Sequence, residues 1–311
     1  MDAELLAHVL PLPSLSPEAH TAIADAFEEL TLHQGEFLFA QEQHRDAMSI
    51  VLEGEIELLA HMGETLQTMI IFQPPNIISA RSLFDDKGIH QQSARVRSSV
   101  ARVARITTAR YQEIHARFPE VDRAFFSYIL DIVDERLDHA NRKLLSLVAA
   151  GNHAATAHTY EELGRLVSPT LVDTMRCKHF FLLQFFAQRW VLAWTNEPVG
   201  ATTPSGSAFP NDALLDRMAA TKESQWLTGD QARSLTHYSA EEIIAVPCLD
   251  NNDLVGAIII GDRPGGHFSI NTVLHMETVS AILAAAFRRL NQQNIARGQA
   301  ELDQEYVLPF S

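Results

Sequence analysis

The side chains best suited to catalysis or metal binding are scattered along this chain rather than grouped into motifs. Its two cysteines, Cys177 and Cys248, are too few for a disulfide framework or a thiolate zinc site. Among the 14 histidines, His153 and His158 are five residues apart, and no His-Glu-x-x-His set occurs. A phosphate-binding glycine loop, a nucleophile elbow and an acid pair that could share one cleft are also missing. We therefore expect no enzyme, no metal site and no cofactor.

The composition is typical of a soluble globular protein with two domains. The chain has 311 residues, of which 46% are hydrophobic and 20% charged, which is enough for two separate cores. It begins Met1-Asp2-Ala3-Glu4, without a basic signal-peptide region, and has no uninterrupted apolar run of about 18 residues. We expect a cytoplasmic protein without a membrane span. The formal net charge of -15 repels phosphodiester backbones.

The first hundred residues predict a short helix followed by a rolled β structure. A helix is expected over residues 14–30, with Ser16 as N-cap and Pro17 at the first helical position. Residues 32–106 then carry short β-rich runs, separated by turn signals at Gly35, Gly54, Gly63 and Pro74-Pro75. Regular short strands of this kind favour a closed or rolled sheet.

The glycine turns at Gly35 and Gly54, the strands around them and the long helix that follows resemble the cyclic-nucleotide-binding domain of the catabolite-activator family. The resemblance covers about residues 10–148. It matches residues 72–84 and 92–96 to the family's phosphate-binding cassette, in which a glutamate bonds the ribose hydroxyl and an arginine pairs with the cyclic phosphate. The ligand-binding positions that it implies are Ser79, Ala80, Arg81, Ser82, Leu83, Gln92, Ser93 and Ala94.

Both charged contacts of that cassette are replaced in this chain. Ala80 stands at the glutamate and Gln92 at the arginine, so neither family interaction can form. Losing a buried charged contact costs a few kcal/mol, or roughly two orders of magnitude in affinity. We therefore expect no binding of ordinary cyclic AMP or cyclic GMP. Either the pocket is vestigial, or Arg81 or Arg95 reaches the cavity and receives another anion, such as a cyclic dinucleotide.

The winged helix-turn-helix of the catabolite-activator family has no counterpart after the long helix. From Tyr160 the chain becomes β-rich and shows no recognition-helix pattern, and its net charge is unfavourable for DNA. We expect no direct DNA binding.

A heptad pattern marks residues 109–148 as a long helix. Its apolar residues alternate four and three positions apart: Phe126, Leu130, Val133, Leu137, Ala140, Leu144 and Leu147. A two-stranded coiled coil buries such a seam. Packing of one helix on its own β-roll is the alternative, but the seam is longer than a small roll could cover, so we favour a homodimer. A closing helix over Asn271–Gln293 carries a second candidate seam: Met276, Val279, Leu283, Ala286 and Leu290.

The order of elements after residue 160 resembles a GAF domain, with PAS as the structural runner-up. A helix is followed by strands at His179–Phe186 and Trp190–Trp194, a variable segment, and two apolar strands, Glu242–Leu249 and Leu254–Gly261, around a hairpin turn. The cysteine surroundings of bilin-binding and sulfoxide-reducing GAF domains are missing, as is the cyclic GMP signature.

Four residues are candidates for a ligand pocket in this second half: Trp194, Phe209, Trp226 and Asp230. Aromatic walls with one polar anchor suit an apolar pocket, and the Pro- and Gly-rich loop from Glu197 to Asn211 is long enough to form a wall or lid. Core or lid packing is the alternative for each of them.

The predicted fold class is α+β. It comprises a jelly-roll-like N-terminal β-roll with flanking helices (residues 10–148, including the long dimerisation helix), a linker at 149–159, a GAF-like domain with an antiparallel sheet at 160–295, and a tail at 296–311. The predicted function is non-enzymatic: a cytoplasmic sensory or regulatory homodimer that relays a small-molecule or partner signal to an unidentified protein. The alternatives are a receptor for a cyclic dinucleotide, a dimerisation adaptor with two vestigial pockets, and an enzyme that uses the GAF pocket.

Overall fold

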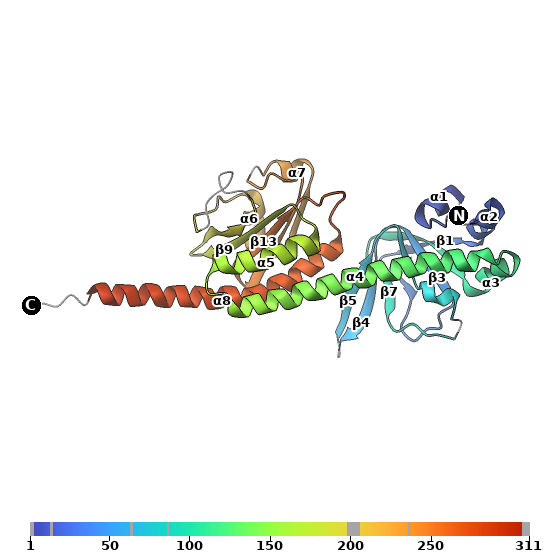
Figure 1. The fold of residues 1–311 in the computed structure, drawn as a ribbon, viewed down its shortest axis with the longest axis horizontal. Coiled ribbons are helices and arrows are strands. Elements are labelled where there is room, and N and C mark those ends of the chain that lie inside the picture. Colours follow the sequence, from blue (N-terminus) through green and yellow to red (C-terminus); the bar gives the residue numbers. More distant parts are fainter. Residues whose placement is uncertain are drawn as a thin grey trace, which may run out of the picture. The chain divides into compact units, whose positions relative to one another are not determined.

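The computed structural model describes residues 3–12, 15–62, 65–85, 87–197, 206–235 and 237–306 (Figure 1). The chain divides into two compact units, Met1–Leu137 and Asp138–Ser311, and the division falls within helix α4 (Glu120–Thr156). Each half of α4 is therefore described with its own unit. Residues 149–156 of the predicted linker belong to this helix, because Ala150 and Ala154 are buried in the second unit's core.

The first unit opens with two short helices, α1 (Ala3–Val9) and α2 (Pro17–Ala26). The Ser16 hydroxyl accepts the Ala19 N–H at 3.3 Å, as expected of an N-cap. The helix predicted to run to residue 30 ends at Ala26, so that prediction was wrong at its C-terminal end. Leu30 instead lies in a strand opposite Val103, because its side chain packs against the interior of the β-roll.

Two four-stranded antiparallel sheets form the β-roll, with strand orders β1-β8-β3-β6 and β2-β7-β4-β5. The strands are β1 (Glu28–His33), β2 (Phe37–Phe39), β3 (Ala47–Glu53), β4 (Ile56–Met62), β5 (Thr65–Phe72), β6 (Asn76–Ile78), β7 (Ser93–Val96) and β8 (Val100–Thr107). Inward-facing side chains from both sheets make one core, among them Val51, Ile56, Ala94 and Val103. The rolled β structure predicted from the turn signals is confirmed.

Helices cover the outer face of the first sheet. α1, α2, α3 (Thr108–Arg117) and the first half of α4 pack there. Strand alternation supplies the apolar surface, because Met48 and Ile50 of β3 face the helices while Val51 faces the roll. Tyr111 and Phe125 meet edge to face in this layer, with ring centroids 5.3 Å apart.

The second unit is a three-layer structure around one five-stranded antiparallel sheet of order β10-β9-β13-β12-β11. The strands are β9 (His179–Phe186), β10 (Arg189–Thr195), β11 (Gln225–Thr228), β12 (Glu242–Asp250) and β13 (Asp253–Gly261). α5 (Tyr160–Met175), α8 (Ile270–Tyr306) and the second half of α4 cover one face, and α6 (Ala213–Thr221) and α7 (Asp230–Arg233) cover the other. Because both faces are covered, the middle segments of the two central strands, residues 243–246 of β12 and 257–260 of β13, are apolar and buried at every position.

Helix α8 corrects two predictions about the end of the chain. Its seam residues, Met276, Val279, Leu283, Ala286 and Leu290, are at most 2% exposed and pack against the unit's own sheet. They form core and not a second dimer surface, because the sheet already covers them. The helix also continues to Tyr306, through most of the predicted tail.

Only one helix of the described part of the chain, within Ile270–Ala296, is long and apolar enough to cross a membrane by length and composition. Its apolar seam faces the sheet of the second unit, as described above. A buried core helix accounts for this composition.

A close approach between α5 and β10 depends on Gly164. A Cβ atom placed there would overlap the Cβ and Cγ atoms of Trp194. We expect Gly164→Ala to destabilise the second unit by roughly 1–3 kcal/mol, as overpacking does. Thermal unfolding followed by tryptophan fluorescence measures this, since all three tryptophans lie in this unit.

Gly151 provides the matched control, because it also lies within a helix but has no atom within 4 Å of an added Cβ. Gly151→Ala should leave stability unchanged or raise it by up to about 1 kcal/mol, through better helix propensity. Equal effects of the two substitutions would contradict the close packing of α5 on Trp194.

A buried hydrogen bond joins α4 to α8 inside the second unit. Ser146 donates its hydroxyl proton to the Lys143 carbonyl at 2.8 Å, so the His275 Nε2–H is the donor in its 2.8 Å bond to Ser146 Oγ. Burial, helped by the charges of Lys143 and His139, lowers the pKa of His275 to about 4. The ring is therefore neutral at physiological pH.

This histidine predicts acid sensitivity of the second unit. Between pH 6.5 and 4 the unfolded imidazole is protonated while the folded one is neutral, so stability falls as the pH drops through that window and is unaffected above it. The loss should be on the order of 3 kcal/mol near pH 4, since one pKa unit corresponds to about 1.4 kcal/mol. In His275→Gln, whose amide N–H can still reach Ser146, the tryptophan-monitored stability should fall less steeply over the same range. An unchanged slope would contradict this.

Candidate functional site

The cassette segment satisfies its own polar groups. It consists of β6, then Ser79 in the left-handed backbone region with a φ of 60°, then the short 3-10 helix η1 (Ala80–Leu83). Ser79 and Ser82 join their hydroxyls at 2.8 Å, and the Ser82 carbonyl accepts the Thr108 hydroxyl at 2.7 Å. Ser82 is fully buried, and Leu83 and Ala80 pack against the helical core. These residues are used for folding.

In the second part of the cassette, Ser93 and Ala94 are also engaged in contacts within the fold. Ser93 accepts the backbone N–H of Gln41 at 2.9 Å, and Ala94 is fully buried in the roll. Gln92 is half-buried, and its side chain makes no hydrogen bond to any residue that the structure describes. Among the described residues, Gln92 therefore has no charged hydrogen-bond partner.

The two arginines considered as substitutes both have carboxylate partners. Arg95 donates to Glu57 Oε1 from Nε at 2.9 Å and from Nη2 at 2.6 Å, and the Thr68 hydroxyl donates to Glu57 Oε2 at 2.7 Å. Arg81 is 74% exposed and lies 3.4 Å from Asp85. Because Glu57 is buried and depends on Arg95 for compensation, removing that arginine to bind an anion would be costly. Arg95 is therefore committed to Glu57, whereas Arg81 is an exposed side chain whose partner Asp85 also pairs with Arg45 at 3.1 Å.

Arg136 of α4 is a contact that the sequence reasoning missed. It donates to the Ile77 carbonyl at 2.8 Å and to Asn76 Oδ1 at 3.2 Å, and its guanidinium lies 5.5 Å from the centre of the Phe72 ring. Desolvation lowers the pKa of this guanidinium. The residue is one position before Leu137 in the heptad, where the periodicity gives no reason to expect a contact. It ties α4 directly to the strand that leads into the cassette.

The predicted seam on α4 is exposed along most of its length. In the first unit, Phe126, Leu130, Val133 and Leu137 are each more than half exposed, although Phe126 also meets Phe84 edge to face at 6.0 Å. In the second unit Leu144 is 60% exposed, and Ala140 is exposed as well. Leu147 is half-buried and packs against the second unit's core. Most seam residues therefore do not contribute to the hydrophobic core of their own unit.

The four pocket candidates of the second unit do not share one pocket. Phe209 is 5% exposed and packs with Tyr238 on the α6 side of the sheet, whereas Trp194 packs against the core on the opposite face. Trp226 lies on the edge strand β11, and Asp230 is fully exposed and paired with Arg233. Residues 198–205 of the predicted loop lie outside the described residues.

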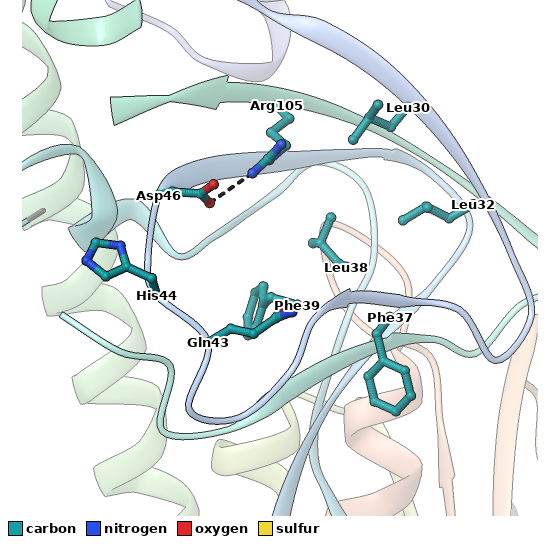
Figure 2. Close-up of a pocket in the computed structure, with 9 residues that line it drawn as sticks. All are labelled: Leu30, Leu32, Phe37, Leu38, Phe39, Gln43, His44, Asp46 and Arg105. Atoms are coloured by element: carbon teal, nitrogen blue, oxygen red, sulfur yellow. Dashed lines mark hydrogen bonds and ion pairs between the residues drawn. The ribbon is translucent and has the colours of Figure 1, made fainter. Parts of the chain in front are cut away.

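The β-roll has an open cavity of about 460 Å3 (Figure 2), and its lining residues Phe37 and Phe39 lie on β2, which pairs with β7 in the second part of the cassette. Side chains of β1 and β2 form its apolar wall, and its polar wall carries the 2.8 Å ion pair between Arg105 and Asp46. The lining residues are Leu30, Leu32, Phe37, Leu38, Phe39, Gln43, His44, Asp46 and Arg105. No cassette position is among them, so the cavity does not correspond to the predicted nucleotide site.

Within the described residues, no group of three or more His, Cys, Asp and Glu side chains is placed to hold a metal ion. Both cysteines are buried, and burial raises the pKa of the Cys177 thiol to about 12 and also raises that of Cys248. Neither thiol is therefore activated as a nucleophile.

No protein-family model matches the chain, and no curated protein matches it either. Several solved structures of cyclic-nucleotide-binding proteins and regulators match part of it. The N-terminal domain of a transcriptional regulator from Streptomyces coelicolor is 22% identical, with 42% of this chain and 93% of that chain covered and a TM-score of 0.37.

Two further structures give similar values. The catabolite activator protein of Thermus thermophilus is 22% identical over 53% of this chain and 84% of its own, with a TM-score of 0.37. A cyclic nucleotide-binding domain from Methylobacillus flagellatus is 14% identical over 46% and 84%, with a TM-score of 0.41. Because all three TM-scores are below 0.5, we base the function on this chain's own residues.

The cassette geometry predicts that ordinary cyclic nucleotides leave the first unit unaffected. Cyclic AMP or cyclic GMP at about 100 µM should not raise its unfolding midpoint, because a ligand that binds only weakly adds little stability. Far-UV circular dichroism is the suitable probe, since the tryptophans report only on the other unit. A rise of several degrees with either nucleotide would show that the cassette binds without its glutamate and arginine.

Proposed function

We propose that this chain is a non-catalytic regulatory protein that acts as a homodimer joined along α4. The observation that carries the proposal is the exposed apolar seam of α4, which includes Leu130, Val133, Leu137 and Leu144. An apolar stripe with this spacing is the surface that a second helix of the same kind covers in a two-stranded coiled coil. A second copy of the chain supplies a matching stripe by symmetry.

The position of the seam on α4 supports this assignment. In the first unit Val121 and Phe125 of the same helix are buried against the roll, and in the second unit Ser146 and Ala150 are buried against the core. Each half of α4 therefore already has an inward face, and the seam is a second apolar face. Exposing several large apolar side chains in a row is unfavourable for a monomer.

Signalling through α4 would work as a shift between two packings of the helix. Arg136 links α4 to Asn76 and Ile77, next to the cassette, so a change in β6 would alter the helix and the dimer contact. A ligand or partner can shift this equilibrium only by binding one packing more tightly than the other. We place the protein in the cytoplasm and expect the output to pass to a separate protein through its surface.

We further propose that the second unit is a GAF-like sensory module, and the order of its elements supports this. A helix, two strands, the α6–β11 segment, two strands and a closing helix follow one another as expected. The adaptor alternative draws support from the filled region around Phe209 and Tyr238 and from the internally bonded cassette. The cyclic dinucleotide alternative loses support at Arg95, which is paired with the buried Glu57.

Charge on the seam should separate the dimer. Leu137→Glu places two carboxylates, one from each copy, in the proposed interface and removes two apolar contacts. We expect the dimer dissociation constant to rise at least about a hundredfold, from loss of roughly 1.5 kcal/mol per copy. Sedimentation velocity over a range of protein concentrations measures the change.

Leu145 offers a matched control on the same helix, because it is 65% exposed but falls outside the four-three spacing. Leu145→Glu should change the dissociation constant much less than Leu137→Glu does. A wild-type chain that stays monomeric at micromolar concentration, or equal effects of the two substitutions, would rule out dimerisation through this seam.

A further inference from the structure

The second unit contains a charged cavity that none of the four pocket residues predicted from the sequence lines, although Trp226 and Asp230 each bond to a residue of its lining. It lies at one end of the sheet, where β11 and β13 finish and β12 begins, and its volume is about 520 Å3. Lys178, Glu242 and the loop Asp262–His267 contribute to its lining. A cavity of this size can hold a small metabolite.

Glu242 places a buried carboxylate in the wall of this cavity. Its side chain is 7% exposed, and its two oxygens accept the Trp226 indole N–H at 2.9 Å and the Phe268 backbone N–H at 3.0 Å. Both donors are neutral, so they satisfy hydrogen bonds without supplying a positive charge. The nearest imidazole, that of His267, is 89% exposed and 3.6 Å away. A buried carboxylate of this kind favours a cationic group beside it.

Asp262 adds a second acid, next to an unpartnered imidazole nitrogen. Its Oδ1 accepts the backbone N–H groups of Glu241 and Glu242 at 2.8 and 3.0 Å. Its Oδ2 lies 3.6 Å from His179 Nε2, which has no hydrogen-bond partner among the described residues although the His179 side chain is only 5% exposed. The other ring nitrogen of His179 contacts Glu197.

The free oxygen of Asp262 suits an ammonium group. Asp262 lines the cavity, and its Oδ2 makes no hydrogen bond to any described residue, whereas His179 is not among the lining residues. An ammonium group carries three donor hydrogens and could donate one to Asp262 Oδ2.

The cavity also carries cations without acidic partners. Among the described residues, Lys178 and Arg263 have no carboxylate oxygen within 4.0 Å, and Arg263 donates only to the His267 carbonyl at 3.2 Å. By contrast, Arg233 in the same lining is paired with Asp230 and Glu241. Lys178 and Arg263 are thus free to bind an anionic group, and an arginine binds a carboxylate especially well.

From these contacts we propose that the cavity binds a free amino acid, a small zwitterion whose ammonium group faces Asp262 and Glu242 and whose carboxylate faces Arg263 and Lys178. The proposal goes beyond the dimer function, because it gives the second unit a ligand of its own. Binding and dimerisation can therefore fail independently.

Other ligand classes fit the lining less well. A phosphate-rich ligand such as a nucleotide would be repelled by Glu242 and Asp262, which line the same cavity as the cations. A metal ion lacks a suitable ligand set among the described residues. A zwitterion carries one positive and one negative group, so it can pair with the acidic and the basic residues of the lining at the same time.

The test is a binding screen with the twenty standard L-amino acids, each at about 5 mM and pH 7.5, which is saturating for a dissociation constant near 0.1 mM. Tryptophan-monitored thermal unfolding provides the readout, because Trp226 bonds directly to Glu242. We expect at least one amino acid to raise the unfolding midpoint. Its N-acetyl derivative, which lacks the ammonium group, and its amide, which lacks the carboxylate, should each bind at least tenfold more weakly by calorimetry.

Two substitutions test the proposed contacts. Arg263→Met should weaken binding of the selected amino acid at least tenfold, whereas Arg165→Met should not, because Arg165 is an exposed arginine of α5 outside the lining. Lys178→Met provides a second test if Arg263→Met fails to fold. No stabilisation by any amino acid, equal binding of the blocked derivatives, or unchanged binding by the cavity variant would overturn the proposal. Loss of dimerisation with binding retained would affect only the proposed function.

Discussion

Helix α4 has two apolar faces, and its own units cover only one of them. Val121 and Phe125 pack inward in the first unit, and Ala150 and Ala154 pack inward in the second, while Leu130, Val133 and Leu137 remain exposed. Without its packing against the two units, α4 would be only marginally stable as a helix, because most helical stability in proteins comes from packing. Both units depend on α4 for part of their cores, so its uncovered face is the feature around which the proposed assembly is built.

The two units differ in whether the charged side chains at their candidate sites are paired with opposite charges. In the β-roll, Arg95 is paired with the buried Glu57, and Arg81 shares Asp85 with Arg45. The roll therefore uses the charge of Arg95 within its own fold. At the end of the second unit's sheet, Lys178 and Arg263 keep their charges unpaired beside Glu242 and Asp262. Lys178 is exposed and Arg263 is half-buried, so a ligand can reach both charges from solvent, which directs the search for a ligand away from the cassette.

Much of the fold followed from local patterns in the sequence. The turn signals and short strands predicted the β-roll, and the strand-turn-strand at Glu242–Gly261 predicted the hairpin of β12 and β13. The errors came from competition between local and tertiary preferences. Leu30 fits a helix by spacing, yet it lies in β1 because it packs against the roll there. The seam of α8 has the same periodicity as that of α4, but a sheet covers it.

The candidate sites were harder to predict than the fold. Trp194 and Phe209 both have aromatic side chains, which suit a ligand pocket. They nevertheless pack on opposite faces of one sheet, because strand alternation and the path of the chain place them there. Arg136 gave no signal, because its partners are backbone and amide oxygens far away in the sequence. The charged cavity could not be predicted either, because its residues are distant in the sequence. Lys178, Glu242 and Arg263 come from three separate segments and meet only in the folded chain.

The sequence alone determined that Ala80 and Gln92 stand where the cassette it resembles has a glutamate and an arginine, since neither side chain can supply a charge in any fold. It also determined the spacing of the apolar residues on α4. Only the tertiary structure decided which of two similar seams is covered, which arginines are already paired, and where unpaired charges gather. Residue type and spacing are fixed by the chain, whereas burial and charge pairing depend on neighbours that are distant in the sequence.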